Sequence, residues 1–115
     1  MVRSGLVRLH DAESAALSLE SRFDLAYNAA HALSLAALRW HGYRSENRYL
    51  VFQCLEHTIA LEKPQWRVLD QAHNKRNLAE YEGELDVDEA LVEALLRAAR
   101  LVAERVTALG PVRQP

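Results

Sequence analysis

The stretch from Ala12 to Trp40, "AESAALSLESRFDLAYNAAHALSLAALRW", decides the fold because its apolar residues recur at a regular spacing. Steps of four and three residues alternate through the whole set: Ala12, Ala16, Leu19, Phe23, Ala26, Ala30, Leu33, Ala37 and Trp40. A helix with this spacing has one apolar face, which it buries against neighbouring helices. Because the alanine side chains are short, we expect a neighbouring helix to approach this face closely.

The ends of this helix are marked by residues that begin and end helices. Asp11 is suited to cap the start, and Gly42 is suited to follow the last turn. One helix over 12–41 would contain about 30 residues and would be about 45 Å long. "SRFD" also reads as a cap followed by an acid three residues later, which favours a break near Ser21. The sequence leaves open whether 12–41 is one helix or two.

Two further helices are predicted in the middle of the chain. The segment 46–62, "ENRYLVFQCLEHTIALE", has a broad apolar face. The members of that face are Val51, Phe52, Leu55 and Ile59. Pro64 suits the first turn of the next helix, where its missing N–H costs nothing, and Gly83 suits the end of that helix. We therefore predict helices over 46–62 and 64–82.

The last helix is predicted from "LDVDEALVEALLRAARLVAERVTALG", in which Asp86 and Glu89 resemble a capping box. Its inward stripe continues through Leu91, Leu95, Ala98, Val102, Arg105 and Leu109. No stretch alternates apolar and polar residues long enough to suggest a sheet. The predicted fold is therefore all-α, an antiparallel up-and-down bundle of four or five helices. It would form one domain over 1–115, with an ordered core over about 11–109 and flexible ends.

The composition limits the classes of function. A chain of 115 residues forms a modest core, so association with another chain would help it. The formal net charge of -2 gives no global attraction to nucleic acid, so RNA binding would need a local basic patch. The single cysteine, Cys54, excludes an internal disulfide and is expected in the core. No apolar run reaches the length of a membrane span or of a secretory signal, so we expect a cytoplasmic protein.

Polar side chains gather in the third predicted helix, in "AHNKRNLAEYEG" over 72–83. They are His73, Arg76, Asn77, Glu80 and Tyr81. On a helical wheel these residues flank the buried side, whereas a helix that needed only solubility would place its charges opposite that side. In one interpretation Arg76 pairs with Glu80, and Asn77 with Tyr81, on a half-exposed surface. In the other, the Arg76 guanidinium binds an anion or an RNA phosphate, and the Asn77 amide orients it. One helix alone hardly forms a pocket, so a two-fold dimer would bring two such faces together.

A family resemblance rests on two stretches, "KRNLAEYEG" in this helix and "RFDLAYNAAHALSLAALRWHGYR" in the first helix. Both resemble small bacterial members of the HEPN superfamily (higher eukaryotes and prokaryotes nucleotide-binding domain). The resemblance covers roughly 12–109 and implies a bundle of four to five helices, a homodimer and a role related to nucleotides or RNA. The metal-independent ribonucleases of this family pair two copies of one motif across the dimer interface.

In that motif an Arg, often followed directly by Asn, Asp or His, is separated from a His by four to six intervening residues. The resemblance implies that Arg76, Asn77 and Tyr81 occupy the catalytic positions, with Tyr81 in place of the His. An imidazole moves protons near neutral pH, whereas a phenol does so poorly. His73 faces the same way as Arg76 but precedes it in the chain. The departure at Tyr81 weakens the case for RNA cleavage.

Three further residues are candidates for binding. His73 and Glu80 lie beside Arg76, and His31 lies in "YNAAH" on the first helix, which the bundle could bring towards Arg76. A core or interface histidine is the other interpretation of His31.

Metal and cofactor chemistry is not indicated by the remaining residues. Cys54 and His57 share a helix face, but structural zinc needs four ligands. We predict no metal and no cofactor. Trp40 and Trp66 are expected to be packing anchors rather than platforms for stacking bases.

The leading hypothesis is a HEPN-like homodimer that acts as a binding or regulatory subunit without robust catalysis. As the resemblance implies, its partner would be a nucleotidyltransferase or the other member of a toxin–antitoxin pair, with no membrane association. One alternative is a metal-independent ribonuclease, in which Arg76 binds phosphate and Tyr81, Glu80 or His73 handles protons. The other alternative is a structural dimer with no ligand.

Overall fold

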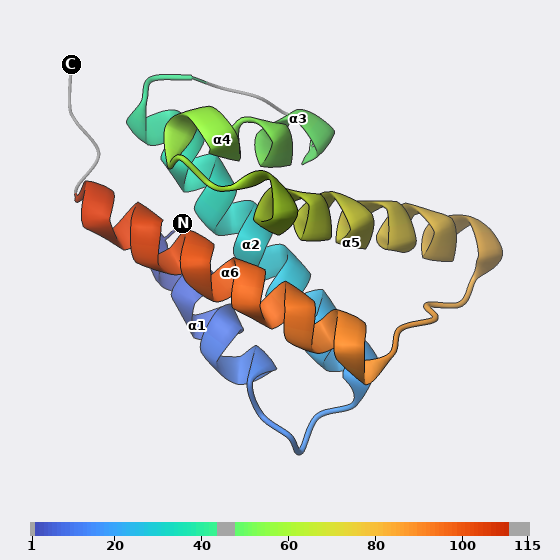
Figure 1. The fold of residues 1–115 in the computed structure, drawn as a ribbon. Coiled ribbons are helices and arrows are strands. Elements are labelled where there is room, and N and C mark those ends of the chain that lie inside the picture. The colour runs from blue at the N-terminus through green and yellow to red at the C-terminus, as the bar shows by residue number, and fades with distance from the viewer. Residues whose placement is uncertain (1, 44–47, 111–115) are drawn as a thin grey trace.

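The structure is a computed structural model that describes residues 2–43 and 48–110. Within these ranges all regular structure is helical, which confirms the predicted all-α class (Figure 1). The helices are α1 (Val2–Ala12), α2 (Leu19–Trp40), α3 (Arg48–Gln53), α4 (Leu55–Thr58), α5 (Lys63–Glu82) and α6 (Glu89–Leu109). None of the helices in the described ranges has the length and apolar character needed to cross a membrane. The antiparallel topology and the HEPN-like arrangement remain predictions.

Helix α2 lies at the centre of the molecule and makes its most extensive contacts with α1 and α6 (Figure 1). From Phe23 to Ala37 the predicted apolar spacing describes its buried face correctly, whereas Ala16 is exposed before the start of α2, and Leu19 and Trp40 are only partly buried. Its fully buried members are Phe23, Ala26, Ala29, Ala30, Leu33 and Ala37. The opposing face of α6 is equally apolar, because Val92, Leu95, Leu96, Ala98, Ala99 and Val102 are all fully buried. These two faces form most of the hydrophobic core.

The helical structure is interrupted between Ala12 and Leu19, so the prediction of a single helix over 12–41 is wrong. The N-cap of α2 is Ser18, whose hydroxyl accepts a hydrogen bond from the Ser21 N–H at 3.1 Å. Arg22 stabilises the break, because its Nε donates to the carbonyl of Ala12 at 3.0 Å and so satisfies the end of α1. Gly42 follows the last turn of α2 with a φ of 85°, as predicted.

Residues before Ala12 form α1, a helix that the sequence pattern does not predict. Asp11 therefore lies in the last turn of α1 and does not cap α2. Gly5 explains how closely α1 approaches α2: a Cβ at this position would lie 2.8 Å from the Cγ of Leu33. Leu9 and Ala12 are buried on the same face. The helix that packs closely against the alanine-rich α2 is thus α1, at the N-terminal end of the chain.

The segment 46–62 is two short helices rather than one, and residues 46–47 lie outside the described residues. Its predicted apolar face is buried at Val51, Phe52, Leu55 and Ile59, whereas Cys54 is half-buried between α3 and α4. The helical path ends because Ala60 has a φ of 53°.

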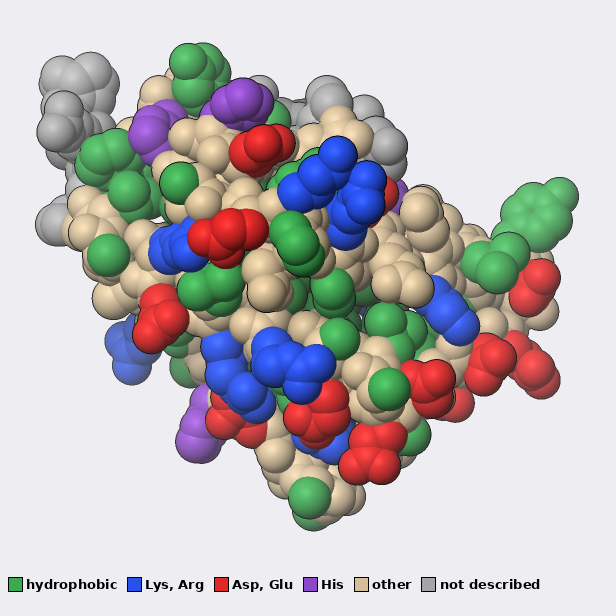
Figure 2. All heavy atoms as spheres, viewed as in Figure 1, with side chains coloured by type: hydrophobic (Ala, Val, Ile, Leu, Met, Phe, Trp, Pro, Cys, Tyr) green, Lys and Arg blue, Asp and Glu red, His purple; other side chains and the backbone are tan. Residues whose placement is uncertain are grey.

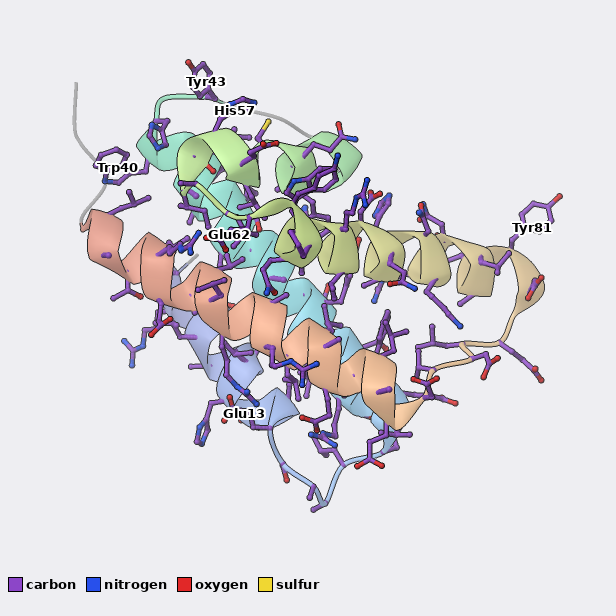
Figure 3. The ribbon with its side chains drawn as sticks, in the orientation of Figure 1. Glu13, Trp40, Tyr43, His57, Glu62 and Tyr81 are labelled. Atoms are coloured by element: carbon purple, nitrogen blue, oxygen red, sulfur yellow. The ribbon has the colours of Figure 1, made fainter. Side chains whose placement is uncertain are left out.

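Arg105 of α6 holds the turn that follows α4. Its Nη1 donates to the carbonyl of Ala60 at 2.7 Å, and its Nη2 donates to Glu62 Oε1 at 2.8 Å. Glu62 directly precedes α5, so this one side chain joins α6 to the start of α5 (Figure 3). Arg105, from a helix distant in the sequence, therefore stabilises the turn in which α4 ends at Thr58, an end that the local spacing does not predict.

The boundaries of α5 follow the prediction closely, and the start of α6 does not. Pro64 lies in the first turn of α5, and Gly83 ends it with a φ of 81°. The N-cap of α6 is Asp88, whose Oδ1 accepts from the Leu91 N–H at 2.8 Å, so the predicted start at Asp86 is wrong. The Asp86 carbonyl instead accepts a hydrogen bond from Lys75 Nζ at 2.7 Å, which ties the link after α5 back to that helix.

A polar cluster between helices α2 and α5

Helix α5 has few apolar contacts with the rest of the protein. Its buried residues are Leu69 and Ala72, and its sequence is polar after that point. Beyond Ala72 the side of α5 that faces α2 carries polar side chains. Five of the six predicted candidate residues lie in this half of α5, and the sixth, His31, lies on α2.

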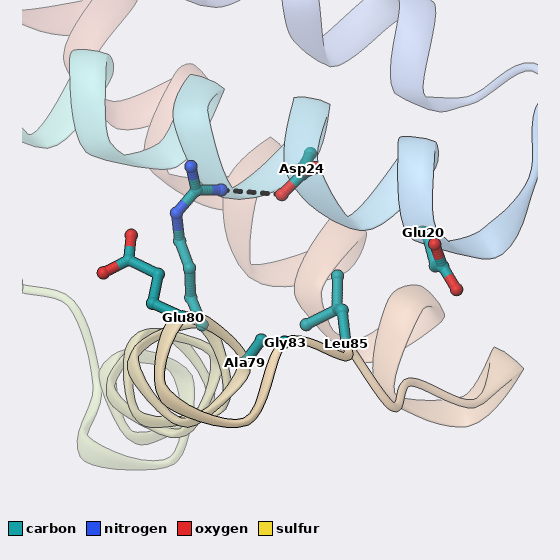
Figure 4. Close-up of a pocket in the computed structure, with 7 residues that line it drawn as sticks. Glu20, Asp24, Ala79, Glu80, Gly83 and Leu85 are labelled. Carbon is teal, nitrogen blue, oxygen red and sulfur yellow. Dashed lines mark hydrogen bonds and ion pairs between the residues drawn. The ribbon is translucent and has the colours of Figure 1, made fainter.

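Arg76 points from α5 towards α2. Its Nη1 donates to Asp24 Oδ1 at 2.6 Å, and its Cζ lies 5.0 Å from the centroid of the Tyr27 ring (Figure 4). The side chain of Arg76 is 28% exposed and that of Asp24 is 52% exposed. The predicted pairing of Arg76 with Glu80 is therefore replaced by a pairing with another helix. Asp24 and Tyr27 are site residues that the sequence reasoning did not identify.

His73 and Asn77 extend this cluster along α5. The Oη of Tyr27 lies 2.9 Å from Nδ1 of His73, and Nδ2 of Asn77 lies 3.1 Å from Nε2 of His73. With the amide as donor, Nε2 accepts, so the neutral imidazole carries its proton on Nδ1 and donates it to Tyr27. Asn77 therefore pairs with His73, not with Tyr81 as the structural interpretation predicted.

His31 joins the cluster through Phe52. Its ring packs edge-on against Phe52, with centroids 6.1 Å apart. Phe52 in turn lies edge-on to Tyr27 at 5.8 Å and to His73 at 6.4 Å. The structure therefore brings "YNAAH" towards Arg76, with Tyr27 in direct contact. It places His31 on the far side of the aromatic rings.

Tyr81 lies apart from the other candidates. It is 93% exposed at the end of α5 and projects away from the body of the protein (Figure 3). Glu80, in contrast, lines the same cavity as Arg76. The structure thus groups Arg76, Asn77 and His73, adds Glu80 at the edge, and leaves Tyr81 outside.

The cavity beside Arg76 has a volume of about 320 Å³ and is lined by Glu20, Asp24, Arg76, Ala79, Glu80, Gly83 and Leu85 (Figure 4). A second hollow of about 590 Å³ adjoins it and is lined by Glu20, Glu82, Gly83, Glu84, Leu85 and Asp86. Figure 2 shows acidic side chains gathered beside the link between α5 and α6. Carboxylates outnumber the one guanidinium, so the local field favours cations and opposes phosphate groups.

The residues that were weighed as metal ligands or as platforms for stacking bases are consistent with structural roles. Across residues 2–43 and 48–110, no three His, Cys, Asp or Glu side chains are grouped as metal ligands would be. The Trp40 ring packs against His41 at a centroid distance of 4.9 Å, and Trp66 packs against the hydrophobic core. Neither tryptophan lines the cavity beside Arg76.

Comparison with known proteins adds no assignment. No protein-family model, no curated protein and no solved structure matches the chain. The function is therefore inferred from the residues and their geometry.

Proposed function

We propose that the chain is a homodimeric, HEPN-like helical subunit that binds or regulates a partner and does not cleave RNA. The resemblance of "KRNLAEYEG" and of the α2 sequence to HEPN proteins supports this class. The same resemblance implies the kind of partner, a nucleotidyltransferase or the other member of a toxin–antitoxin pair. The contacts of Arg76 support a binding subunit over a nuclease.

The observation that carries the proposal is that the Arg76 guanidinium already contacts residues of its own chain. A guanidinium that stabilises a phosphate must offer its N–H donors to that phosphate. Here Nη1 already donates to Asp24 Oδ1, and the guanidinium carbon lies over the ring of Tyr27. Three carboxylates, those of Glu20, Asp24 and Glu80, line the adjoining cavity. An RNA phosphate would approach a guanidinium that is already paired with Asp24 and would meet two further negative charges.

The ribonuclease remains the second candidate because of one observation. His73 lies one turn before Asn77 and is hydrogen-bonded to it, so an imidazole lies in the same polar row as Arg76. In that function His73 would accept the proton of the ribose 2′-hydroxyl as its oxygen bonds to phosphorus. The P–O5′ bond would break, the leaving oxygen would take a proton from water, and Arg76 would stabilise the charge on the phosphate.

A cleavage assay separates the two candidates. Labelled RNA would be incubated in EDTA with the wild type, Arg76→Ala, His73→Ala and the surface control Arg97→Ala, each checked for folding by circular dichroism. We expect the same background with all four proteins. Cleavage by the wild type and by Arg97→Ala that is lost in the Arg76 and His73 variants would overturn the proposal and establish the nuclease.

A binding assay separates a regulatory subunit from a purely structural dimer. The chain would be co-expressed with the product of the gene next to its own, with an affinity tag on one of the two proteins. We expect the two proteins to co-purify in a fixed ratio. A chain that dimerises but never retains the neighbouring product would favour the structural dimer.

A further inference from the structure

The last two turns of α5 present two large apolar side chains to solvent. Leu78 is 53% exposed and Tyr81 is 93% exposed, and Tyr81 projects away from the body of the protein (Figure 3). They are three positions apart in the helix, so they lie about one turn apart on the same side. We call this pair the Leu78–Tyr81 ridge. Tyrosine is enriched among the residues that dominate protein–protein binding, and neighbouring exposed apolar groups mark interaction sites.

The chain around this ridge is strongly acidic. From Asn77 to Leu96 it contains no Lys, Arg or His. The acids over the same range are Glu80, Glu82, Glu84, Asp86, Asp88, Glu89 and Glu93. The formal net charge of the whole chain is only -2, so negative charge is concentrated here, and Figure 2 shows it gathered beside the link between α5 and α6. This end of the molecule therefore attracts cations and repels anions.

The end of α5 places two of these charges against the helix dipole. Glu80 and Glu82 lie in its last turn, which contains no basic residue. The C-terminal end of a helix carries partial negative charge, so carboxylates are unfavourable there and a cation is favourable. A cationic group bound beside Tyr81 would therefore offset a repulsion that the free chain leaves in place. Such departures from the usual charge pattern are expected at functional sites.

An acidic hollow adjoins the ridge. It has a volume of about 590 Å³, and Glu82, which directly follows Tyr81 in the chain, lines it. Its carboxylates come from α2, from α5 and from the link between α5 and α6: Glu20, Glu82, Glu84 and Asp86. None of the described residues that line it is basic. The ammonium of Lys75 donates to the main-chain carbonyl of Asp86, so it tethers the link and offsets at most one of these charges.

We propose that a cationic segment of a partner protein docks on this end of the molecule. An apolar side chain of that segment would pack on the Leu78–Tyr81 ridge, and its Arg or Lys side chains would enter the acidic hollow. The inference rests on the binding role proposed above, and it names the surface and the chemistry of the partner. Charge complementarity commits the surface to a basic protein segment, because a nucleic acid would be repelled. A second copy that presented this same surface would be repelled as well.

A peptide assay tests the chemistry of the partner. A short fluorescein-labelled peptide in which arginine alternates with leucine would be titrated with the protein and followed by fluorescence anisotropy. Matched peptides would carry glutamate in place of arginine, or glycine in place of leucine. We expect the arginine–leucine peptide to bind with an affinity that falls as salt is raised, and the glutamate peptide not to bind. The peptide without leucine should bind at least about fivefold more weakly, because it cannot pack on the ridge.

Variants of the protein locate the site. Glu82→Gln and Glu84→Gln should each weaken binding of the arginine–leucine peptide by about two- to fivefold, as expected for the loss of one exposed ion pair. Tyr81→Ala should weaken it by at least about fivefold. Glu82→Gln removes a charge that the helix dipole disfavours, so weaker binding could not be attributed to unwinding of α5.

Two matched controls should leave the affinity unchanged. Glu104→Gln removes the same charge from an exposed position near the other end of α6. Tyr43→Ala removes an aromatic ring that is 63% exposed and distant from Tyr81 (Figure 3). Equal weakening by Glu104→Gln and Glu82→Gln would overturn the proposed surface, because the attraction would then come from net charge alone.

The remaining outcomes separate this surface from the binding role itself. The co-purification described above would be repeated with Tyr81→Ala, Glu82→Gln and Tyr43→Ala, and only the first two should lose the partner. A partner that all three variants retain equally would overturn this surface and leave the binding role intact. A wild type that binds the arginine–leucine peptide here but retains no neighbouring product would overturn the binding role alone. Labelled RNA that displaces the peptide from the wild type would overturn the assignment to a protein segment.

Discussion

Arg76 makes two contacts within its own chain, and solvent partly screens both. Exposed ion pairs contribute about 0.2–1 kcal/mol, and exposed cation–π contacts contribute about 0.5–1 kcal/mol. The 2.6 Å ion pair with Asp24 and the contact with Tyr27 belong to these classes. Arg76 should therefore contribute about 1–2 kcal/mol towards holding α5 against α2.

A double-mutant cycle would measure the ion pair. Arg76→Ala should lower the free energy of unfolding by about 1–2 kcal/mol and Asp24→Ala by about 0.5–1 kcal/mol, with a coupling energy of about 0.5–1 kcal/mol. Urea denaturation provides all three values. Arg97→Ala, an exposed arginine on α6, should change stability by less than about 0.5 kcal/mol. A coupling energy of zero between Arg76 and Asp24 would contradict the contact.

The sequence indicates that Arg76, Asn77 and His73 share one side of a helix, and it cannot indicate what they touch. Their partners depend on how α2 is rotated about its own axis relative to α5. Tyr27 could be placed near Arg76 only in general terms, as the first residue of "YNAAH" on α2. No feature of the sequence indicated Asp24, because an exposed acid beside the apolar face of α2 resembles any other solvated charge.

At the scale of elements, the contact between α1 and α2 depends on the absence of a side chain at Gly5. A Cβ there would lie 2.8 Å from the branched Cγ of Leu33 and 3.4 Å from the carbonyl oxygen of Ala29. Leu33 is fully buried, so it has little room to move. A larger residue would therefore push α1 away from the core.

Gly5→Val should lower the free energy of unfolding by about 1–3 kcal/mol through overpacking. Ser4→Val is the matched control, because Ser4 is exposed on the same helix and the change adds a β-branched residue there too. Thermal or urea unfolding of the two variants would measure the difference. Equal stability of the two variants would show that α1 does not depend on this close approach.

The turn before α5 should respond to acid. The hydrogen bond from Arg105 holds the pKa of the Glu62 carboxyl below its ordinary value of 4.5. The folded state therefore binds this proton less readily than the unfolded state. The resulting stabilisation is fully present above pH 4.5 and is lost as the pH falls through the lowered pKa.

Glu62→Gln would test this dependence. The variant should be less stable than the wild type at neutral pH, and the difference should disappear at pH values below the lowered pKa. Urea denaturation across this pH range provides the measurement. In an Arg105→Gln background the pH-dependent difference should be absent, and its persistence there would assign it to another partner.

Periodicity predicted α2, α5 and α6 well because each carries an apolar face that is long enough to recognise. It failed where long-range contacts override local spacing. Arg105 satisfies the carbonyls of the turn after Thr58, where α4 ends before the predicted boundary, and Arg22 satisfies the end of α1. Helix α1 was missed because Gly5 reads as a helix breaker in isolation and acts as a contact in the structure.

At the scale of the whole molecule, acidic groups are concentrated at one end. Carboxylates supply three of the seven residues that line the first hollow near the link between α5 and α6, and four of the six that line the second. This end is therefore unsuited to phosphate.

The thermal stability should depend on protein concentration. A dimer that forms only between folded chains stabilises them by mass action. We expect the melting temperature of the wild type to rise as its concentration passes through the dissociation constant, as measured by calorimetry. A melting temperature that stays constant over this range of concentration would contradict the homodimer.

The scarcity of buried apolar residues in α5 has a kinetic consequence. Backbone amides exchange with deuterium when a segment opens, and segments with few apolar contacts open at the lowest free energy. Amides after Ala72 should therefore take up deuterium before those of the cores of α2 and α6. Slower uptake there in the presence of the arginine–leucine peptide would report, amide by amide, how much of the helix a docked segment covers.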